Sequence, residues 1–91
     1  MNCVYILQSE KNATYYIGST NDLERRLIEH NAGKTKSLYF LRPMKLMFRQ
    51  QFDSLGHART VEKRLKKMKN RHIIEAIIRD QKIRGRAGKV F

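Results

Sequence analysis

Two side chains suited to binding an anionic group, Arg26 and His30, lie four residues apart in the first third of the chain. They follow the run Tyr15–Gly18, in which strand-forming residues lead to a glycine that lets the backbone turn. Residues four apart share one face of a helix, so a guanidinium and an imidazole are carried together beside this turn. An ordinary solvated helix edge holds similar pairs, and from these residues alone that alternative stays open.

A carboxylate in a basic segment is the third candidate. Glu62 follows Ala58 by four residues and precedes Leu65 by three, so it lies at the edge of an apolar helix stripe. A carboxylate that leans toward the body of the protein needs a partner. The simplest partner is Lys66, four residues further on, in an ordinary helix ion pair, and that alternative also stays open.

Two strands are predicted ahead of the helix that carries Arg26. Residues 3–7 are apolar and rich in strand formers, residues 8–13 are polar, and residues 14–18 return to strand formers. This order predicts a hairpin with a long loop. Because successive strand side chains point to opposite faces, Tyr5 and Tyr16 are expected to share one face.

The first helix is expected to begin near Asp22, with Asn21 and Glu24 at the spacing of an N-terminal capping box. It should end near Gly33, because glycine accepts the left-handed conformation that stops helices. Residues 34–41 are predicted to form a basic loop.

A third strand is predicted over residues 45–52, and two helices follow it. Ser54 is a candidate cap for the first of these helices, and Asn70 separates its apolar stripe from the isoleucine-rich stripe of the second. The predicted order of strand, strand, helix, strand and two helices indicates an α+β domain.

The length of 91 residues allows one small domain, so function is expected on an open surface rather than in a deep cleft. Residues 1–80 are predicted to form that domain, and residues 81–91 a flexible basic tail. Docking of the tail through Val90 and Phe91 is the open alternative.

The charge balance favours a polyanionic partner. Lys and Arg total 20 against 8 Asp and Glu, a formal net charge of +12, which makes nucleic acid the first expectation. No apolar run approaches the roughly 20 residues that span a bilayer, and no signal peptide is recognised, so a cytoplasmic location is expected. The single cysteine, Cys3, excludes an internal disulfide and a Cys/His zinc site.

The ordered set of these residues resembles the GIY-YIG nuclease family. The second half of the family motif is present verbatim as Tyr16-Ile17-Gly18, and the tyrosine of the first half is kept in Cys3-Val4-Tyr5. Arg26 and His30 follow on the next helix, and Glu62 on a later one. The resemblance is to the small, free-standing bacterial members.

The resemblance runs from about Asn2 to Ile78 and implies a fold. That fold is a three-stranded antiparallel sheet flanked by helices, which agrees with the order of elements predicted above. The family motif departs from this chain at its first two letters, because Cys3 and Val4 replace glycine and isoleucine. A catalytic asparagine found in some relatives is not assigned, since Asn70 is better explained as a helix cap.

The resemblance further implies hydrolysis of DNA phosphodiester bonds with Mg²⁺ or Mn²⁺. Glu62 matches the metal-binding carboxylate and Arg26 the phosphate-contacting arginine. Tyr5 matches the residue that takes a proton from the attacking water, while Tyr16 and His30 match positions that shape the site. A free phenol titrates near 10, so Tyr5 is expected to need a nearby cation that lowers its pKa.

Separate DNA-binding domains of the longer family members have no counterpart in the sequence, so DNA contacts are expected from the basic residues Arg25, Lys34, Lys36, Arg42 and Lys66. The expected role is DNA repair or processing, with branched or single-stranded DNA as candidate substrates and RNA binding left open. The alternatives are a non-catalytic nucleic-acid-binding module and an accessory subunit that docks through Met44, Met47 and the isoleucine-rich helix.

Overall fold

The computed structural model describes residues 1–83 and contains one three-stranded antiparallel sheet. Its strands are β1 (Cys3–Ser9), β2 (Tyr15–Thr20) and β3 (Met44–Gln51), in the spatial order β2-β1-β3. The central position of β1 explains its unbroken apolar run, because a central strand covered on both faces has no polar side. The predicted α+β class is therefore confirmed, and the third strand begins one residue earlier than expected.

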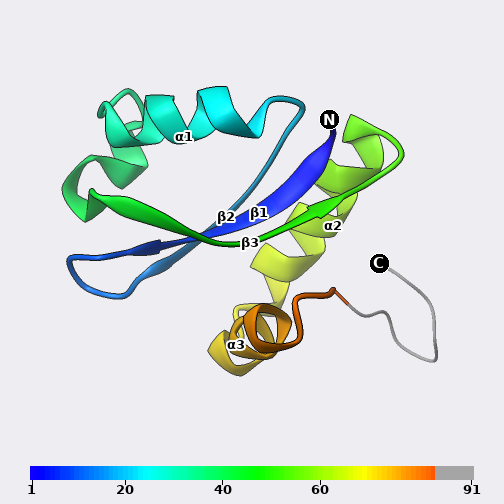
Figure 1. The fold of residues 1–91 in the computed structure, drawn as a ribbon. Coiled ribbons are helices and arrows are strands. Elements are labelled where there is room, and N and C mark those ends of the chain that lie inside the picture. The colour runs from blue at the N-terminus through cyan, green and yellow to red at the C-terminus, as the bar shows by residue number, and fades with distance from the viewer. Residues whose placement is uncertain (84–91) are drawn as a thin grey trace.

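Helices cover both faces of the sheet (Figure 1). On one face lie α1 (Leu23–Asn31) and a short 3₁₀ helix, η1 (Lys36–Leu41). On the other face lie α2 (Leu55–Met68) and α3 (Arg71–Asp80), packed on a large apolar cluster that includes Val4. Because β1 side chains alternate, the same strand sends Tyr5 into a second, smaller cluster beneath α1 and η1.

The start of α1 differs from the prediction by one residue. Asp22, not Asn21, is the N-cap, and its carboxylate accepts a hydrogen bond from the backbone N–H of Arg25 at 3.2 Å. The backbone carbonyl of Asn21 instead accepts a hydrogen bond from the N-terminal amine of Met1 at 2.9 Å. The predicted capping box of Asn21 and Glu24 is therefore wrong, while the predicted helix start near Asp22 holds.

The two later helices begin at the predicted caps. The Ser54 hydroxyl accepts from the backbone N–H of His57 at 3.1 Å. The Asn70 side chain accepts from the backbone N–H groups of His72 and Ile73. Asn70 is thus a helix cap, as the sequence indicated.

The segment predicted as a basic loop over residues 34–41 contains the 3₁₀ helix η1. Leu38 is buried in the cluster beneath α1, which fixes η1 to the sheet. The Asn31 side chain joins the end of α1 to β3 by exchanging two hydrogen bonds with the Met44 backbone, at 2.8 and 3.3 Å.

Packing continues beyond the predicted domain boundary at residue 80. Ile83 is fully buried in the larger cluster, and its backbone N–H donates to the Gln50 side chain at 2.9 Å. The predicted flexible tail over residues 81–91 therefore does not begin at 81, and its remainder, 84–91, lies outside the described residues. Among residues 1–83, every helix is too short or too polar to cross a membrane.

Gly18 is the tightest point of the sheet. It pairs with Tyr5 across the strands, and a Cβ added at Gly18 would lie 2.5 Å from Tyr5 Cζ and closer still to the phenol oxygen. Any side chain at Gly18 would therefore displace the Tyr5 ring.

We expect Gly18→Ala to lower the free energy of unfolding by about 1–3 kcal/mol, because the Tyr5 ring must move or the strands must separate. Gly56→Ala is the matched control, because a Cβ there meets nothing closer than Ser54 Oγ at 3.9 Å and alanine is the better helix former. Urea denaturation of both variants measures the effect. A Gly18→Ala protein as stable as wild type would contradict this packing.

Candidate active site

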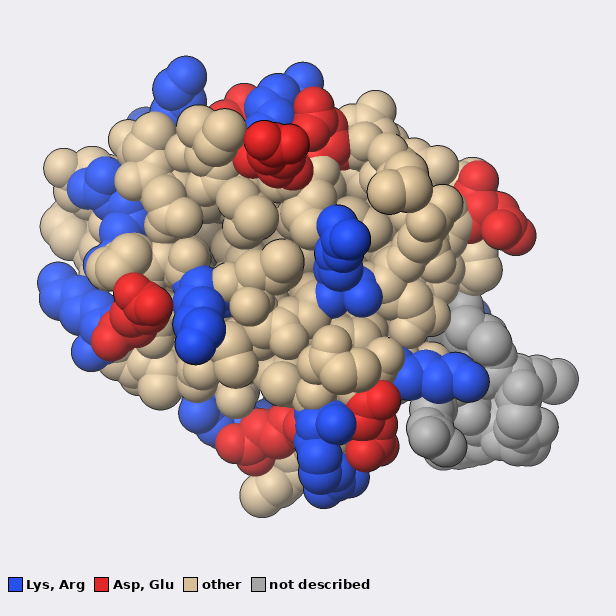
Figure 2. Space-filling model, viewed as in Figure 1, with Lys and Arg blue, Asp and Glu red and all other residues tan. Residues whose placement is uncertain are grey.

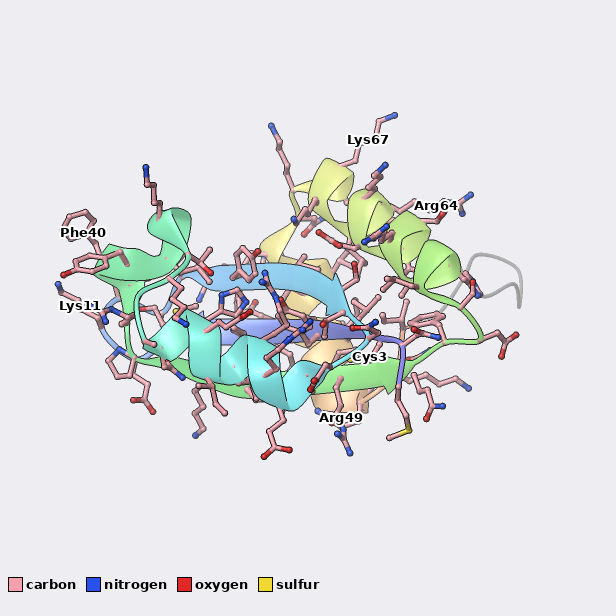
Figure 3. All side chains as sticks on the ribbon, turned by 90° about the horizontal axis from the view of Figure 1, so that it is seen from above. Cys3, Lys11, Phe40, Arg49, Arg64 and Lys67 are labelled. Atoms are coloured by element: carbon pink, nitrogen blue, oxygen red, sulfur yellow. The ribbon has the colours of Figure 1, made fainter. Side chains whose placement is uncertain are left out.

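Four elements carry the five residues predicted to act in catalysis. β1 carries Tyr5, β2 carries Tyr16, α1 carries Arg26 and His30, and α2 carries Glu62. α1 and α2 lie on opposite sides of the β2 edge of the sheet, as the view in Figure 3 shows. The candidate site therefore gathers around that edge.

Three rings form the buried part of the site. The ring centroid of Tyr5 lies 6.4 Å from that of Tyr16 and 6.0 Å from that of His30. The Tyr16 and His30 rings meet edge to face at 5.4 Å. The strand alternation had predicted that the two tyrosines share a face, and this packing confirms it.

A chain of hydrogen bonds links these rings to the neighbouring elements. Tyr5 Oη lies 3.0 Å from His30 Nε2, and His30 Nδ1 lies 2.8 Å from Thr35 Oγ1. The Arg26 guanidinium lies close enough to the Tyr5 oxygen to oppose the rise of the phenol pKa. The donor and acceptor roles in the two His30 hydrogen bonds depend on the tautomer: with the ring proton on Nδ1, Nε2 accepts from the Tyr5 hydroxyl and Nδ1 donates to Thr35.

Burial controls the protonation of this chain. It raises the pKa of Tyr5 to about 12, against the lowering effect of the hydrogen bond and charge of Arg26. Burial also lowers the pKa of His30, and the positive charge of Arg26 lowers it further. At neutral pH the site therefore holds a neutral phenol beside a neutral imidazole, and the cation expected to activate Tyr5 does not outweigh burial.

Glu62 approaches the site from α2. Its side chain is only 18% exposed; Oε1 accepts a hydrogen bond from the hydroxyl of Ser19 on β2, and Oε2 lies 2.6 Å from Lys66 Nζ. The carboxylate charge acts on Tyr5, since it contributes to the raised pKa of that phenol. The carboxylate thus leans toward the protein as its position on the helix predicted, and the ion pair with Lys66 is present as well.

The five residues predicted to bind DNA fall into two groups. Arg25, Lys34 and Lys36 are exposed. The other two are engaged within the protein: Arg42 Nε donates to the Tyr39 carbonyl at 3.0 Å, and Lys66 holds Glu62 and lies 5.5 Å above the Tyr16 ring. Figure 2 shows the cations of one face spread among acidic side chains rather than gathered in one stripe.

Two residues of the site were missed from the sequence, Ser19 and Thr35. The Ser19 contact joins positions 43 residues apart, so no local periodicity reveals it. Thr35 is five residues from His30, beyond the end of the helix, and its position depends on the turn at Gly33.

Comparison with known proteins gives one family. Residues 1–75 match the GIY-YIG catalytic domain. A UPF0213 protein of Syntrophus aciditrophicus is 38% identical over 78 residues, which cover 84% of this chain and 88% of that protein. No solved structure matches the chain significantly.

Two further relatives carry the same family name. A UPF0213 protein of Streptococcus pneumoniae is 40% identical over 67 residues, covering 72% of this chain and 67% of that protein. A third, from Halobacterium salinarum, is 38% identical over 69 residues, which cover 75% of this chain and 88% of that protein. Because the match to the catalytic domain spans residues 1–75 of the 91, the chain belongs to the GIY-YIG nuclease family.

Proposed function

We propose that this protein is a divalent-metal-dependent endonuclease that hydrolyses DNA phosphodiester bonds. The observation that carries the proposal is the hydrogen-bonded chain from Tyr5 through His30 to Thr35, with the Arg26 guanidinium close to the phenol and the Glu62 carboxylate acting on it. Binding to a nucleic-acid backbone requires exposed cations only, and it gives no reason to bury a phenol between a guanidinium and an imidazole.

Tyr5 and His30 act together on the proton of the attacking water. With a pKa of about 12, Tyr5 is almost entirely protonated at neutral pH, so it does not act as a phenolate that is already ionised before the reaction. Its oxygen lies 3.0 Å from His30 Nε2, which can accept the phenol proton when the imidazole proton is on Nδ1. As the water attacks phosphorus, its proton passes to the Tyr5 oxygen while the phenol proton moves to His30, which becomes an imidazolium with Nδ1 held by Thr35.

Arg26 supplies positive charge where negative charge develops. Attack on a phosphodiester increases the charge on the phosphoryl oxygens, and a preplaced guanidinium stabilises that charge without reorganising. Glu29 holds the guanidinium at 3.1 Å, in a pair whose side chains are about one third exposed. The ion pair with Glu29 and the nearby Tyr5 oxygen together orient the Arg26 guanidinium.

The donors around Glu62 fit a hard divalent cation. They are a carboxylate and a hydroxyl, both oxygen donors, and within residues 1–83 no cluster of three or more His, Cys, Asp or Glu side chains could form a closed metal cage. Mg²⁺ keeps several waters and binds through one or two carboxylates plus substrate phosphates, so one carboxylate suffices. When bound, the ion would neutralise charge on the scissile phosphate and leaving oxygen.

Lys66 competes with a divalent ion for the Glu62 carboxylate. Its ammonium lies 2.6 Å from Glu62 Oε2, and an ammonium and a divalent cation cannot share that position. An ion held by Oε2 would require Lys66 to move away. In the same position, the ammonium lies 5.5 Å from the centroid of the Tyr16 ring, whose face attracts a cation.

The cleaved DNA is proposed to be selected by structure more than by sequence, in DNA repair or processing. The exposed cations Arg25, Lys34 and Lys36 contact phosphates in this proposal, and phosphate contacts carry no sequence information. A non-catalytic binding module is the second candidate, and the variants below distinguish it from the nuclease.

We expect Glu62→Gln to bind DNA with wild-type affinity and to cleave it about a hundredfold more slowly or worse, because an amide binds Mg²⁺ poorly. Glu75→Gln is the matched control, since Glu75 forms an exposed ion pair on α3. Anisotropy in EDTA measures binding, and cleavage of plasmid, single-stranded and branched DNA with Mg²⁺ or Mn²⁺ measures turnover. Cleavage at the wild-type rate by Glu62→Gln would contradict the assignment of Glu62 as a metal ligand and leave only its ion pair with Lys66.

Lys66→Met should tighten Mn²⁺ binding to the DNA-free protein by about twofold to fivefold, because it removes the ammonium that competes with Mn²⁺ for the Glu62 carboxylate. That fold change corresponds to the free energy of a typical surface ion pair. Lys67→Met removes the same charge from the same helix, but Lys67 points away from the sheet (Figure 3). Electron paramagnetic resonance of free Mn²⁺ gives both affinities without any cleavage. Equal shifts in the two variants would show that net charge alone, not competition for Oε2, controls the ion.

Single-turnover cleavage should be nearly constant from pH 7 to pH 9 and should fall as the pH drops through the lowered pKa of His30. His30 must be neutral to accept the phenol proton. Cleavage is therefore expected above the pKa of His30 and is lost below it, where the imidazole is already protonated. A standing phenolate with a pKa of about 12 would instead give a tenfold rise per pH unit across that range.

Tyr5→Phe should lower the rate by about a hundredfold to ten-thousandfold. Tyr16→Phe is the matched control, because it should lower the rate less and keep the pH profile. If Tyr5→Phe cleaves at the wild-type rate, another group takes the proton.

A further inference from the structure

Two aromatic side chains of η1 project from the protein surface. The Phe40 side chain is 77% exposed and that of Tyr39 is 47% exposed, with ring centroids 5.2 Å apart in an edge-to-face arrangement. Phe48 and Phe52, in contrast, are buried in the larger cluster. Exposed neighbouring rings forgo the stabilisation of burial, and such patches commonly mark an interaction surface.

The rings are held in place by the protein beneath them. Leu38 is buried beside Tyr5 and fixes η1 to the sheet. The Arg42 guanidinium lies 4.1 Å from the centroid of the Tyr39 ring and donates to the Tyr39 carbonyl. Gly33 leaves room for this stack, since a Cβ there would lie 2.8 Å from one Arg42 nitrogen. The Tyr39 ring is therefore held in one orientation before a ligand binds, and the Phe40 ring packs against it.

Three lysines lie on segments next to the rings. Lys34 and Lys36 are exposed at the start of η1. The β1–β2 loop is tied to the end of η1 by a hydrogen bond from Ser9 Oγ to the Leu41 carbonyl at 2.6 Å. That loop carries Lys11, at the same end of the molecule as Phe40 in Figure 3.

This surface also connects directly to the candidate active site. Thr35 is the N-cap residue of η1, and its hydroxyl forms a hydrogen bond with His30 Nδ1 at 2.8 Å. Leu38 packs in the same cluster as Tyr5. The segment that carries the rings is therefore fixed by contacts with two residues of the site, His30 and Tyr5.

We propose that Tyr39 and Phe40, with Lys11, Lys34 and Lys36 around them, form an aromatic platform that stacks unpaired bases of single-stranded DNA. Bases in a duplex are already stacked on one another, so only an unpaired base can offer its face to an exposed ring. The cations would contact the phosphates that flank the stacked bases. This inference rests on the proposed action on DNA and adds which form of DNA the protein prefers.

A second copy of the chain is a poorer occupant of the platform. A specific protein interface buries about 800 Å² on each partner, far more than two side chains supply. A two-fold symmetric contact would also bring the lysines of one platform against those of the other, because the same patch faces itself. Their repulsion opposes self-association, whereas the phosphates of DNA neutralise them.

The test compares Phe40→Ala with Ile28→Ala, because Ile28 is 64% exposed on α1 and offers no ring. Anisotropy in EDTA measures binding to a labelled thymidine oligonucleotide and to a duplex of equal length. Phe40→Ala should weaken oligonucleotide binding by about fivefold or more and duplex binding by less than about twofold, and Ile28→Ala should change neither. Equal losses on both DNAs, or no loss, would overturn the platform.

Phe40→Trp supplies a direct reporter, since the chain contains no tryptophan. Stacking should quench its fluorescence when the oligonucleotide is added and leave it unchanged with the duplex. Quenching by both DNAs would indicate general contact with DNA and would reject the proposal. A difference in sedimentation between the DNA-free wild type and Phe40→Ala would indicate self-association through the rings and would also reject it. These measurements need no cleavage, so failure of the nuclease proposal leaves the platform separately testable.

Discussion

The close approach of Tyr5 to Gly18 is the constraint on which the rest of the site depends. Tyr5 lies on the central strand and Gly18 opposite it on the edge strand, and only a hydrogen in place of a side chain leaves room for the phenol. The ring therefore lies flat over the neighbouring strand, and its oxygen reaches His30 on α1. The glycine of the family motif is thus explained by the space that the phenol needs.

Burial of a polar group then requires partners for it, and those partners fix the surrounding elements. Among residues 1–83, no buried side-chain nitrogen or oxygen lacks a hydrogen bond. The phenol hydrogen-bonds to His30, and His30 in turn to Thr35 at the start of η1. One buried hydroxyl thereby orients both α1 and the segment that carries the exposed rings.

Local patterns predicted the fold well, and they predicted the site only in part. Strand alternation placed Tyr5 and Tyr16 on one face, and helical spacing turned Glu62 toward the protein, because both follow from backbone periods alone. The Ser19 contact of Glu62 joins two elements distant in sequence, and no single period contains it. The helix at η1 was missed because its stability comes from burying Leu38, a tertiary effect, in a segment too short to show a helical period.

The same distinction applies to protonation. A sequence shows that a cation is available to Tyr5, but the sign of the pKa shift depends on how much water the phenol loses, and here burial exceeds the effect of Arg26. The same loss of water lowers the pKa of His30. The buried phenol resists ionisation, and the imidazole beside it is neutral and can accept a proton. This pair favours proton transfer during the reaction over a phenolate that is already formed before the reaction begins. In the proposed mechanism, burial therefore helps catalysis, because it keeps both members of the pair neutral until substrate arrives.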